Sequence, residues 1–291
     1  MSAGGIQVAA LADGRLHLQH GPIDLVIGAD GAPAEIARAR EAAIGSFGTV
    51  LSDLVMELPL LRAPLGRLRP WLAGPVARRM LDACWPHRAA FITPMAAVAG
   101  AVADHVLAAM TATSRLDRAF VNNGGDIAFH VAPGQALRCG VVADLAAPAI
   151  VGTMRLDARL PVRGLATSGR ACKGRGGRSF SFGIADAVTV LARDGAAADA
   201  AASMVANAVD LPGHPRIERV PADMIDPDSD LGSRPITWDV GPLSAAEVDS
   251  ALESGRARAE SLRQAGLLWG AVLVLRGRTA VVGTTDERIA A

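Results

Sequence analysis

Hydrophobic and polar residues alternate near the start of the chain in the pattern of a β-hairpin. The alternation runs through Arg15–Ile27 on both sides of Gly21-Pro22. Two short antiparallel strands joined by a tight turn are therefore predicted. From Ala34 to about Met56 the apolar residues return at helical spacing, which predicts one amphipathic helix.

The next two segments are predicted to cover and fill the core. Leu60–His87 is rich in proline and arginine and predicts short helices and loops, with Trp71 and Trp85 as anchors. Ala89–Ala103 is the most apolar long stretch, contains Pro94 and falls short of the roughly 20 residues of a membrane-spanning helix. It is predicted to be a buried helix. Its small residues recur at three- and four-residue intervals, which predicts close approach of another backbone; they are Ala96, Ala99, Gly100 and Ala103.

Short β-type runs dominate the rest of the chain, with one alanine-rich helix among them. The predicted strands are Arg118–Asn122, Ile127–Val131, Ala136–Val142, Ile150–Leu156, Ala185–Ala192, Leu267–Leu275 and Thr279–Gly283, and the helix is Ala196–Val209. The first four strands fit a meandering antiparallel sheet. Because helices and strands are segregated, an α+β fold with a mainly antiparallel sheet is favoured. We expect a single domain over residues 1–291, with excursions at 60–90 and 212–242.

Composition narrows the class of partner. The chain has 29 basic and 29 acidic residues and no tyrosine, so nucleic acid and an acidic membrane surface are not expected as partners. Three cysteines without close pairing or zinc-like spacing argue against a disulfide framework. The N-terminus lacks the pattern of an export signal. We expect a cytoplasmic protein, a possible homodimer, with a discrete small-molecule site.

The first motif with possible chemistry is NNGGD, Asn122 to Asp126. Adjacent glycines let the backbone adopt positive φ and present bare amides to a ligand. Asn123 and Asp126 would add polar side chains beside Gly124 and Gly125. The alternative is a tight turn whose polar residues bond only to local backbone, and this is preferred for the motif in isolation.

The second motif is the loop Gly164–Gly183. Thr167, Ser168 and Gly169 combine hydroxyl groups with a permissive backbone, and the cations that follow suit phosphate recognition. Those cations are Arg170, Lys173, Arg175 and Arg178, with Cys172 among them. The alternative is a mobile, solvated loop, since the spacing is not that of a Walker loop or a Rossmann fingerprint.

The third motif is a polar stripe on the alanine-rich helix. Asp199, Ser203 and Asn207 stand four residues apart and so share one helix face. A carboxylate and a hydroxyl one turn apart can hold Mg²⁺ together with water and phosphate oxygens. Equally, Asp199 can sit in the first turn for the helix dipole while Ser203 bonds back to the helix.

Taken in order, the three motifs resemble the ApbE-like proteins, relatives of the FAD:protein FMN transferases, and most closely the branch called protein family 0280. The matching residues are GGD at Gly124–Asp126, ATSG at Ala166–Gly169 and ADAAAS at Ala198–Ser203. The resemblance implies a T-fold-like layered structure. It also implies that Asp199 and Ser203 hold Mg²⁺ and that Gly124, Gly125, Ser168 and Gly169 line a pocket for FAD, FMN or another phosphorylated ligand.

The chain departs from the transferases at the HxxDP motif. Here the sequence is Gly183, Ile184, Ala185, Asp186 and Ala187, so the histidine and the proline are both missing. A metal- and flavin-binding enzyme with changed chemistry is therefore expected. The alternatives are a non-catalytic flavin- or metabolite-binding accessory protein, a cytoplasmic enzyme of sulfur or thiol metabolism, and a true FMN transferase with a substitute base.

Overall fold

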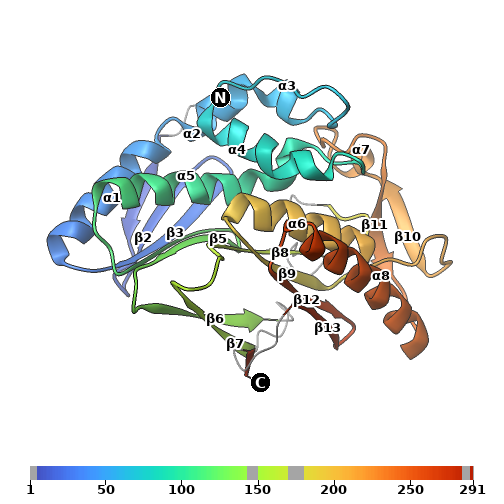
Figure 1. Ribbon diagram of the computed structural model, residues 1–291. Helices are drawn as coiled ribbons and strands as arrows, with labels where there is room; N and C mark the ends of the chain where they lie inside the picture. The colour runs from blue at the N-terminus through green and yellow to red at the C-terminus, as the bar shows by residue number, and fades with distance from the viewer. Residues whose placement is uncertain (1–4, 143–149, 170–179, 284–288, 291) are drawn as a thin grey trace. The chain divides into compact units, whose positions relative to one another are not determined.

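The chain folds into two compact units of mixed helix and strand. The computed structural model describes residues 5–142, 150–169, 180–283 and 289–290 (Figure 1). The first unit comprises residues 1–138, 155–166 and 192–199, and the second comprises residues 139–154, 167–191 and 200–291. All strand pairs whose register is defined among the described residues are antiparallel. The predicted α+β class is confirmed.

An antiparallel sheet forms one layer of the first unit. Its strands follow the order β1 (Gln7–Ala10), β2 (Leu16–His20), β3 (Ile23–Asp30), β4 (Arg118–Asn123), β5 (Asp126–Val131) and β8 (Gly164–Ser168). The predicted hairpin is β2 and β3, with Leu18 opposite Leu25 and both side chains fully buried. Period-2 alternation was sufficient to find it, because one face of these strands is buried.

Helices form the other layer of the first unit (Figure 1). They are α1 (Pro33–Phe47), α2 (Val50–Met56), α3 (Leu58–Leu61), α4 (Pro75–Cys84) and α5 (Val98–Thr113), with short 3₁₀ turns at Trp85–His87 and Pro94–Ala97. Helix α5 packs against α1, β4 and β5. The prediction of one helix over 34–56 was wrong. The helix stops at Gly48, whose amide bonds to the carbonyl of Gly45, and glycine is a poor helix former.

Helix α5 confirms the predicted close approach at its small residues. A Cβ atom on Gly100 would lie 2.2 Å from the carbonyl oxygen of Gly195, so only glycine fits there. The predicted length was wrong, because the helical stretch runs from Pro94 to Thr113, 20 residues. By length and composition alone that stretch could cross a membrane, yet half of its most apolar window is buried inside the protein, as in a core helix.

The prediction that Trp71 anchors the 60–87 segment was also wrong. Its side chain is 80% exposed. Trp85 does take part in packing, because the guanidinium groups of Arg69 and Arg88 lie over its ring, 5.4 and 4.5 Å from the centroid. Leu61, Leu65 and Leu72 are among the buried residues of this segment, together with several side chains of α4.

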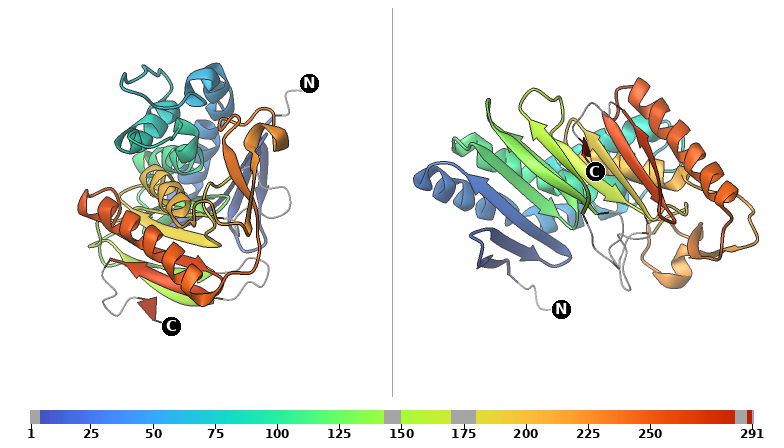
Figure 2. Two further views of the ribbon diagram at one scale, coloured as in Figure 1. Left: turned by 90° about the vertical axis from the view of Figure 1, so that its right-hand side faces the viewer. Right: turned by 90° about the horizontal axis from the view of Figure 1, so that it is seen from below.

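In the second unit, a long helix covers a small sheet (Figure 2). Strands β9 (Ala187–Ala192), β12 (Gly270–Leu275) and β13 (Arg278–Val282) pair in that order, and α8 (Ala245–Gln264) packs on β12 and β13. The sequence analysis missed α8. Its capping box, in which Ser244 and Glu247 exchange bonds with each other's backbone amides, was the available signal.

The remaining elements are an excursion and a separate sheet. The excursion holds β10 (Ile217–Pro221), α7 (Ala222–Ile225) and β11 (Pro235–Val240), and α6 (Gly195–Ala208) is the predicted alanine-rich helix. Strands β6 (Ala136–Val142), β7 (Ile150–Asp157) and β14 (Ile289–Ala290) form a three-stranded sheet of their own. The predicted meander is therefore wrong after β5, because β5 pairs with β8 through Ile127–Leu165 and Ala128–Gly164.

Candidate functional site

The NNGGD motif is the tight turn that joins β4 to β5. Gly124 and Gly125 have φ angles of 65° and 109°, which glycine adopts without strain. Asn122 accepts a hydrogen bond from the Gly125 amide through Oδ1, at 2.8 Å. The interpretation as a local turn is thus confirmed for Asn122. Among the residues that the structure describes, no atom outside the turn itself lies within 4 Å of where a Cβ on either glycine would stand, so the turn is open on that side.

Asn123 reaches away from the turn and meets Asp199 at a single peptide group. Its Nδ2 donates to the carbonyl oxygen of Ala99 at 3.1 Å. The Asp199 carboxylate accepts from the amide of Gly100 through Oδ2, also at 3.1 Å. The carbonyl of Ala99 and the amide of Gly100 belong to the same peptide bond, whose two polar atoms point in opposite directions. Two predicted site residues therefore hold one peptide of α5 from its two sides.

Asp199 is a half-buried acid on the part of α6 that belongs to the first unit. Burial raises the pKa of Asp199 to about 7, against the opposing effect of the Gly100 and Ala99 amides, and the charge of Asp104 adds to the rise. Within the described parts of the chain, no basic side chain forms an ion pair with Asp199. The raised pKa means that the Asp199 carboxyl binds a proton readily, and a metal cation can take the place of that proton.

Asp104 is a buried carboxylate that the sequence analysis did not single out. Its two oxygens accept from the amides of Gly195 and Ala196, at 2.9 and 2.8 Å. These are free amides at the start of α6. Burial is the main cause that raises the pKa of Asp104 to about 6. Both oxygens are occupied by α6, so Asp104 positions the helix that carries Asp199.

The ATSG motif belongs to the second unit from Thr167 onward and is tightly packed. The hydroxyl groups of Thr167 and Thr189 lie 3.0 Å apart. Ser168 is half-buried at the end of β8. Gly169 has a φ of 127°, and a Cβ there would lie 2.7 Å from the carbonyl oxygen of Asp186. Gly169 is thus required by its backbone and by its neighbour.

The segment that replaces HxxDP is packed even more closely. A Cβ on Gly183 would lie 2.0 Å from the carbonyl oxygen of Ala206. Asn207, the third residue of the polar stripe, accepts from the Phe182 amide at 3.0 Å and so holds this segment to α6. Asp186 accepts from the Arg276 amide at 2.5 Å. A histidine side chain has no room at position 183.

The predicted site residues divide between the two units. Asn123, Gly124, Gly125, Asp126 and Asp199 lie in the first, and Thr167, Ser168, Gly169 and Ser203 lie in the second. Ser203 follows Asp199 by one turn on α6. Arg170, Cys172, Lys173, Arg175 and Arg178 lie outside the described residues. Among the described residues no cluster of three or more His, Cys, Asp or Glu side chains has the arrangement of a metal site.

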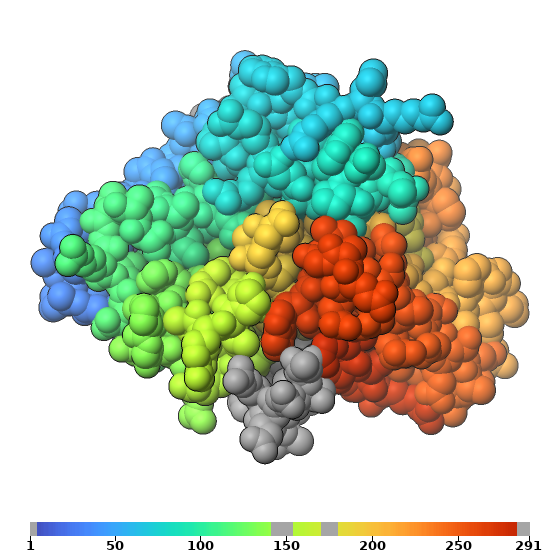
Figure 3. Space-filling view, in the orientation of Figure 1, coloured from blue at the N-terminus to red at the C-terminus, as the bar shows by residue number. Residues whose placement is uncertain are grey.

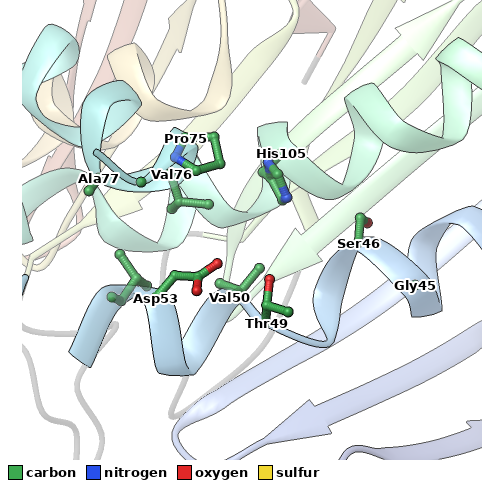
Figure 4. Close-up of a pocket in the computed structure, with 11 residues that line it drawn as sticks. Gly45, Ser46, Thr49, Val50, Asp53, Pro75, Val76, Ala77 and His105 are labelled. Carbon is green, nitrogen blue, oxygen red and sulfur yellow. The ribbon is translucent and has the colours of Figure 1, made fainter. Parts of the chain in front are cut away.

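A separate cavity of about 300 Å³ lies among the helices of the first unit (Figure 4). His105 of α5 points into it, opposite Thr49 and Asp53, and Val50 and Val76 supply apolar walls. Burial lowers the pKa of His105, and the charge of Arg79 lowers it further. The cavity is lined by none of the predicted site residues.

Comparison with known proteins matches the chain to a family profile, to curated relatives and to a solved structure. A sequence profile of the family described as "AbpE bacteria" matches residues 8–281. A UPF0280 protein of Methanospirillum hungatei is 32% identical over 178 residues, 60% of this chain and 68% of that protein. A UPF0280 protein of Methanosarcina acetivorans is 32% identical over 194 residues, 66% of this chain and 72% of that protein. The apo crystal structure of the Pseudomonas stutzeri flavinyl transferase ApbE aligns with a TM-score of 0.44 and 12% identity, covering 100% and 99% of the two chains.

Proposed function

This chain belongs to the AbpE family of bacteria and is a relative of the UPF0280 proteins, and we propose that it binds a flavin or a related phosphorylated small molecule together with Mg²⁺. The proposed reaction differs from protein flavinylation. Cytoplasmic location and a homodimer stay predictions.

The observation that carries the proposal is the shared peptide group of Ala99 and Gly100. Asn123 fixes its carbonyl and Asp199 fixes its amide, so a turn with open glycines is tied to the half-buried carboxyl group of Asp199 within one unit. Mg²⁺ prefers hard oxygen ligands and keeps waters that phosphate oxygens can replace. The carboxylate of Asp199 and the hydroxyl of Ser203 fit such an ion and would hold it.

The open side of the turn suits the anionic part of the ligand. Gly124 and Gly125 leave their backbone uncovered, and bare amides with positive φ bind phosphate oxygens. When bound, Mg²⁺ would offset the charge of a pyrophosphate or phosphate. Thr167, Ser168 and Gly169 are proposed ligand contacts by the resemblance of ATSG to the family motif.

A changed reaction is supported by Gly183. The transferases carry a histidine at the matching position, and here a Cβ alone would lie 2.0 Å from Ala206. The proton-transfer group that histidine would supply is therefore absent from this place. The same observation favours the second candidate function, a flavin- or metabolite-binding accessory protein that performs no turnover.

A titration of Mg²⁺ and FAD by calorimetry tests the binding proposal. Asp199→Asn is expected to weaken FAD binding in Mg²⁺ at least about tenfold, with an unchanged circular dichroism spectrum. Asp194→Asn is the matched control, because Asp194 directly precedes the same helix and accepts from the Ala197 amide at 2.7 Å. Equal affinities of wild type and Asp199→Asn, or equal losses in both variants, would reject Asp199 as the metal ligand.

Incubation with FAD, Mg²⁺ and a threonine-bearing acceptor protein tests the reaction. We expect no mass gain of one FMN on the acceptor. A mass gain would select the true transferase alternative. A ligand that copurifies without a flavin spectrum would select the alternative in sulfur or thiol metabolism.

A further inference from the structure

Exposed hydrophobic side chains gather in one short part of the first unit. Of the ten large hydrophobic side chains that stand exposed in the described residues, five fall within 17 residues of sequence. They are Val55, Met56, Leu60, Leu68 and Trp71, called the Trp71 patch below. Met56, Leu68 and Trp71 are 83%, 89% and 80% exposed. Large exposed apolar patches are typical of interaction surfaces.

The loop that carries the patch is held in place. The carboxylate of Glu57 accepts from the amides of Ala73 and Gly74, at 2.7 and 2.9 Å. These bonds bring the chain just after Trp71 back to the end of α2. Arg69 forms an ion pair with Asp82 of α4. The protein therefore displays the patch on a fixed scaffold, and side chains of this cyan segment project into solvent (Figure 3).

The patch lies in a basic part of a neutral chain. Residues 55–88 contain six arginines and two acidic residues, whereas the whole chain has equal numbers of basic and acidic residues. Arg62 and Arg67, next to the exposed apolar side chains, form no ion pair with any residue that the structure describes. The neutral balance that argued against an acidic membrane surface thus hides a local excess of positive charge.

We propose that the Trp71 patch is a docking surface for an anionic lipid bilayer. Tryptophan and leucine enter the headgroup region, while arginines pair with anionic lipids and keep their charged ends in water. A second copy of this chain fits less well, because a two-fold contact would place the patch against itself and its arginines would repel. Binding would be peripheral and reversible.

Flotation of the full chain with lipid vesicles tests the proposal. We expect binding to vesicles of phosphatidylcholine and phosphatidylglycerol, and at least about tenfold weaker binding to phosphatidylcholine alone or in high salt. Met56→Ser is expected to reduce binding to the anionic vesicles about tenfold. Met224→Ser is its matched control, because Met224 is 74% exposed and lies outside the patch. Arg67→Gln is expected to reduce binding about fivefold, with Arg138→Gln as its control.

Each result of these measurements either supports or overturns the proposed lipid-docking role of the Trp71 patch. Loss of binding in the patch variants, with binding kept in both controls, supports the proposal. Wild-type protein that does not float with anionic vesicles overturns it, and so does equal binding by Met56→Ser and Met224→Ser. A light-scattering mass that falls from dimer to monomer in Trp71→Ser would also overturn it, because the patch would then be a contact between copies. FAD affinity measured on the same variants stays unchanged, so this test is independent of the proposed ligand site.

Discussion

The glycines of the candidate site fall into two pairs with different roles, Gly124 with Gly125 and Gly169 with Gly183. At Gly124 and Gly125 the backbone needs positive φ, and nothing stands within 4 Å of a hypothetical Cβ. At Gly169 and Gly183 the space is filled by carbonyl oxygens at 2.7 and 2.0 Å. The turn at Gly124 and Gly125 is open to solvent or a ligand. The positions of Gly169 and Gly183 are instead packed against the protein's own backbone.

This contrast shows that a glycine in a family motif can either leave the backbone open to a ligand or allow close packing within the protein. Beside the turn at Gly124 and Gly125, Asn123 bonds to the backbone of α5 at the same peptide group that Asp199 contacts. The polar side chains near Gly169 and Gly183 form hydrogen bonds within the protein. Thr167 bonds to Thr189, and Asn207 accepts from the amide of Phe182. A functional interpretation is therefore stronger for the first-unit residues than for ATSG.

The largest expected difference between the two pairs comes from adding one methyl group, at Gly183 or at Gly124. Gly183→Ala should lower the free energy of unfolding by about 3 kcal/mol or more, because the carbonyl of Ala206 cannot move without shifting α6. Gly124→Ala should cost only about 1 kcal/mol, the strain of positive φ in open space. Urea denaturation measures both. Similar denaturation midpoints for the two variants would mean that the backbone around Gly183 is not closely packed.

Removal of a carboxylate separates the roles of Asp104 and Asp199 in the first unit. Asp104→Ala should lower the free energy of unfolding by about 2–3 kcal/mol, since two amides at the start of α6 lose their acceptor. Asp104→Asn should lose less, because one acceptor oxygen remains. Thermal unfolding of both variants beside Asp199→Asn provides the measurement. A larger loss in Asp199→Asn than in Asp104→Ala would contradict the assignment of Asp104 as the structural aspartate.

The elements that the sequence predicted correctly are those with a strong local period. The β2–β3 hairpin and α6 follow from alternation and from alanine spacing, each within a few residues of the structural bounds. Helix α8 escaped notice because several of its buried positions are alanine or glycine, as at Ala251, Gly255 and Ala259. Such small residues give a weak apolar pattern, although the capping box at Ser244 was visible.

The key contact of the candidate site could not be predicted from the sequence. Asn123 and Asp199 meet at the peptide of Ala99 and Gly100 only because α5 packs against both β4 and the start of α6. Those segments lie 24 and 99 residues apart along the chain. The motifs identified which polar residues to examine, and three-dimensional packing decided which of them share a location.

A smaller effect distinguishes the two asparagines of the open turn. Asn122→Ala and Asn123→Ala should each cost about 1 kcal/mol, because each loses one hydrogen bond. Only Asn123→Ala should also weaken FAD binding in Mg²⁺, since Asn123 fixes the peptide that Asp199 contacts. Calorimetry on the matched pair tests this. If Asn122→Ala weakened binding as much as Asn123→Ala, the turn as a whole, rather than its link to α5, would be responsible.

The smallest expected effect concerns how helix α8 is held in the second unit. Helix α8 packs through Gly255 against Val209 and Leu273, and Glu247 caps its start while bonding to His214 at 2.8 Å. The bond to His214 is the main cause that lowers the pKa of Glu247 from 4.5 to about 2. A carboxyl with a lowered folded-state pKa stabilises the protein above its unfolded pKa and loses that contribution as the pH falls.

Glu247→Gln should therefore lower Tm by about 2 °C at pH 7. The gap to wild type should shrink as the pH falls from 4.5 toward 2. Glu253→Gln is the control, since Glu253 pairs with Arg256 on the same helix but caps no amide. The protection factors for hydrogen exchange at α8, corrected for the intrinsic rate at each pH, should fall in wild type as the pH is lowered and change less in Glu247→Gln. A Tm gap that stays constant down to pH 2 would show that the cap acts by geometry rather than by its charge.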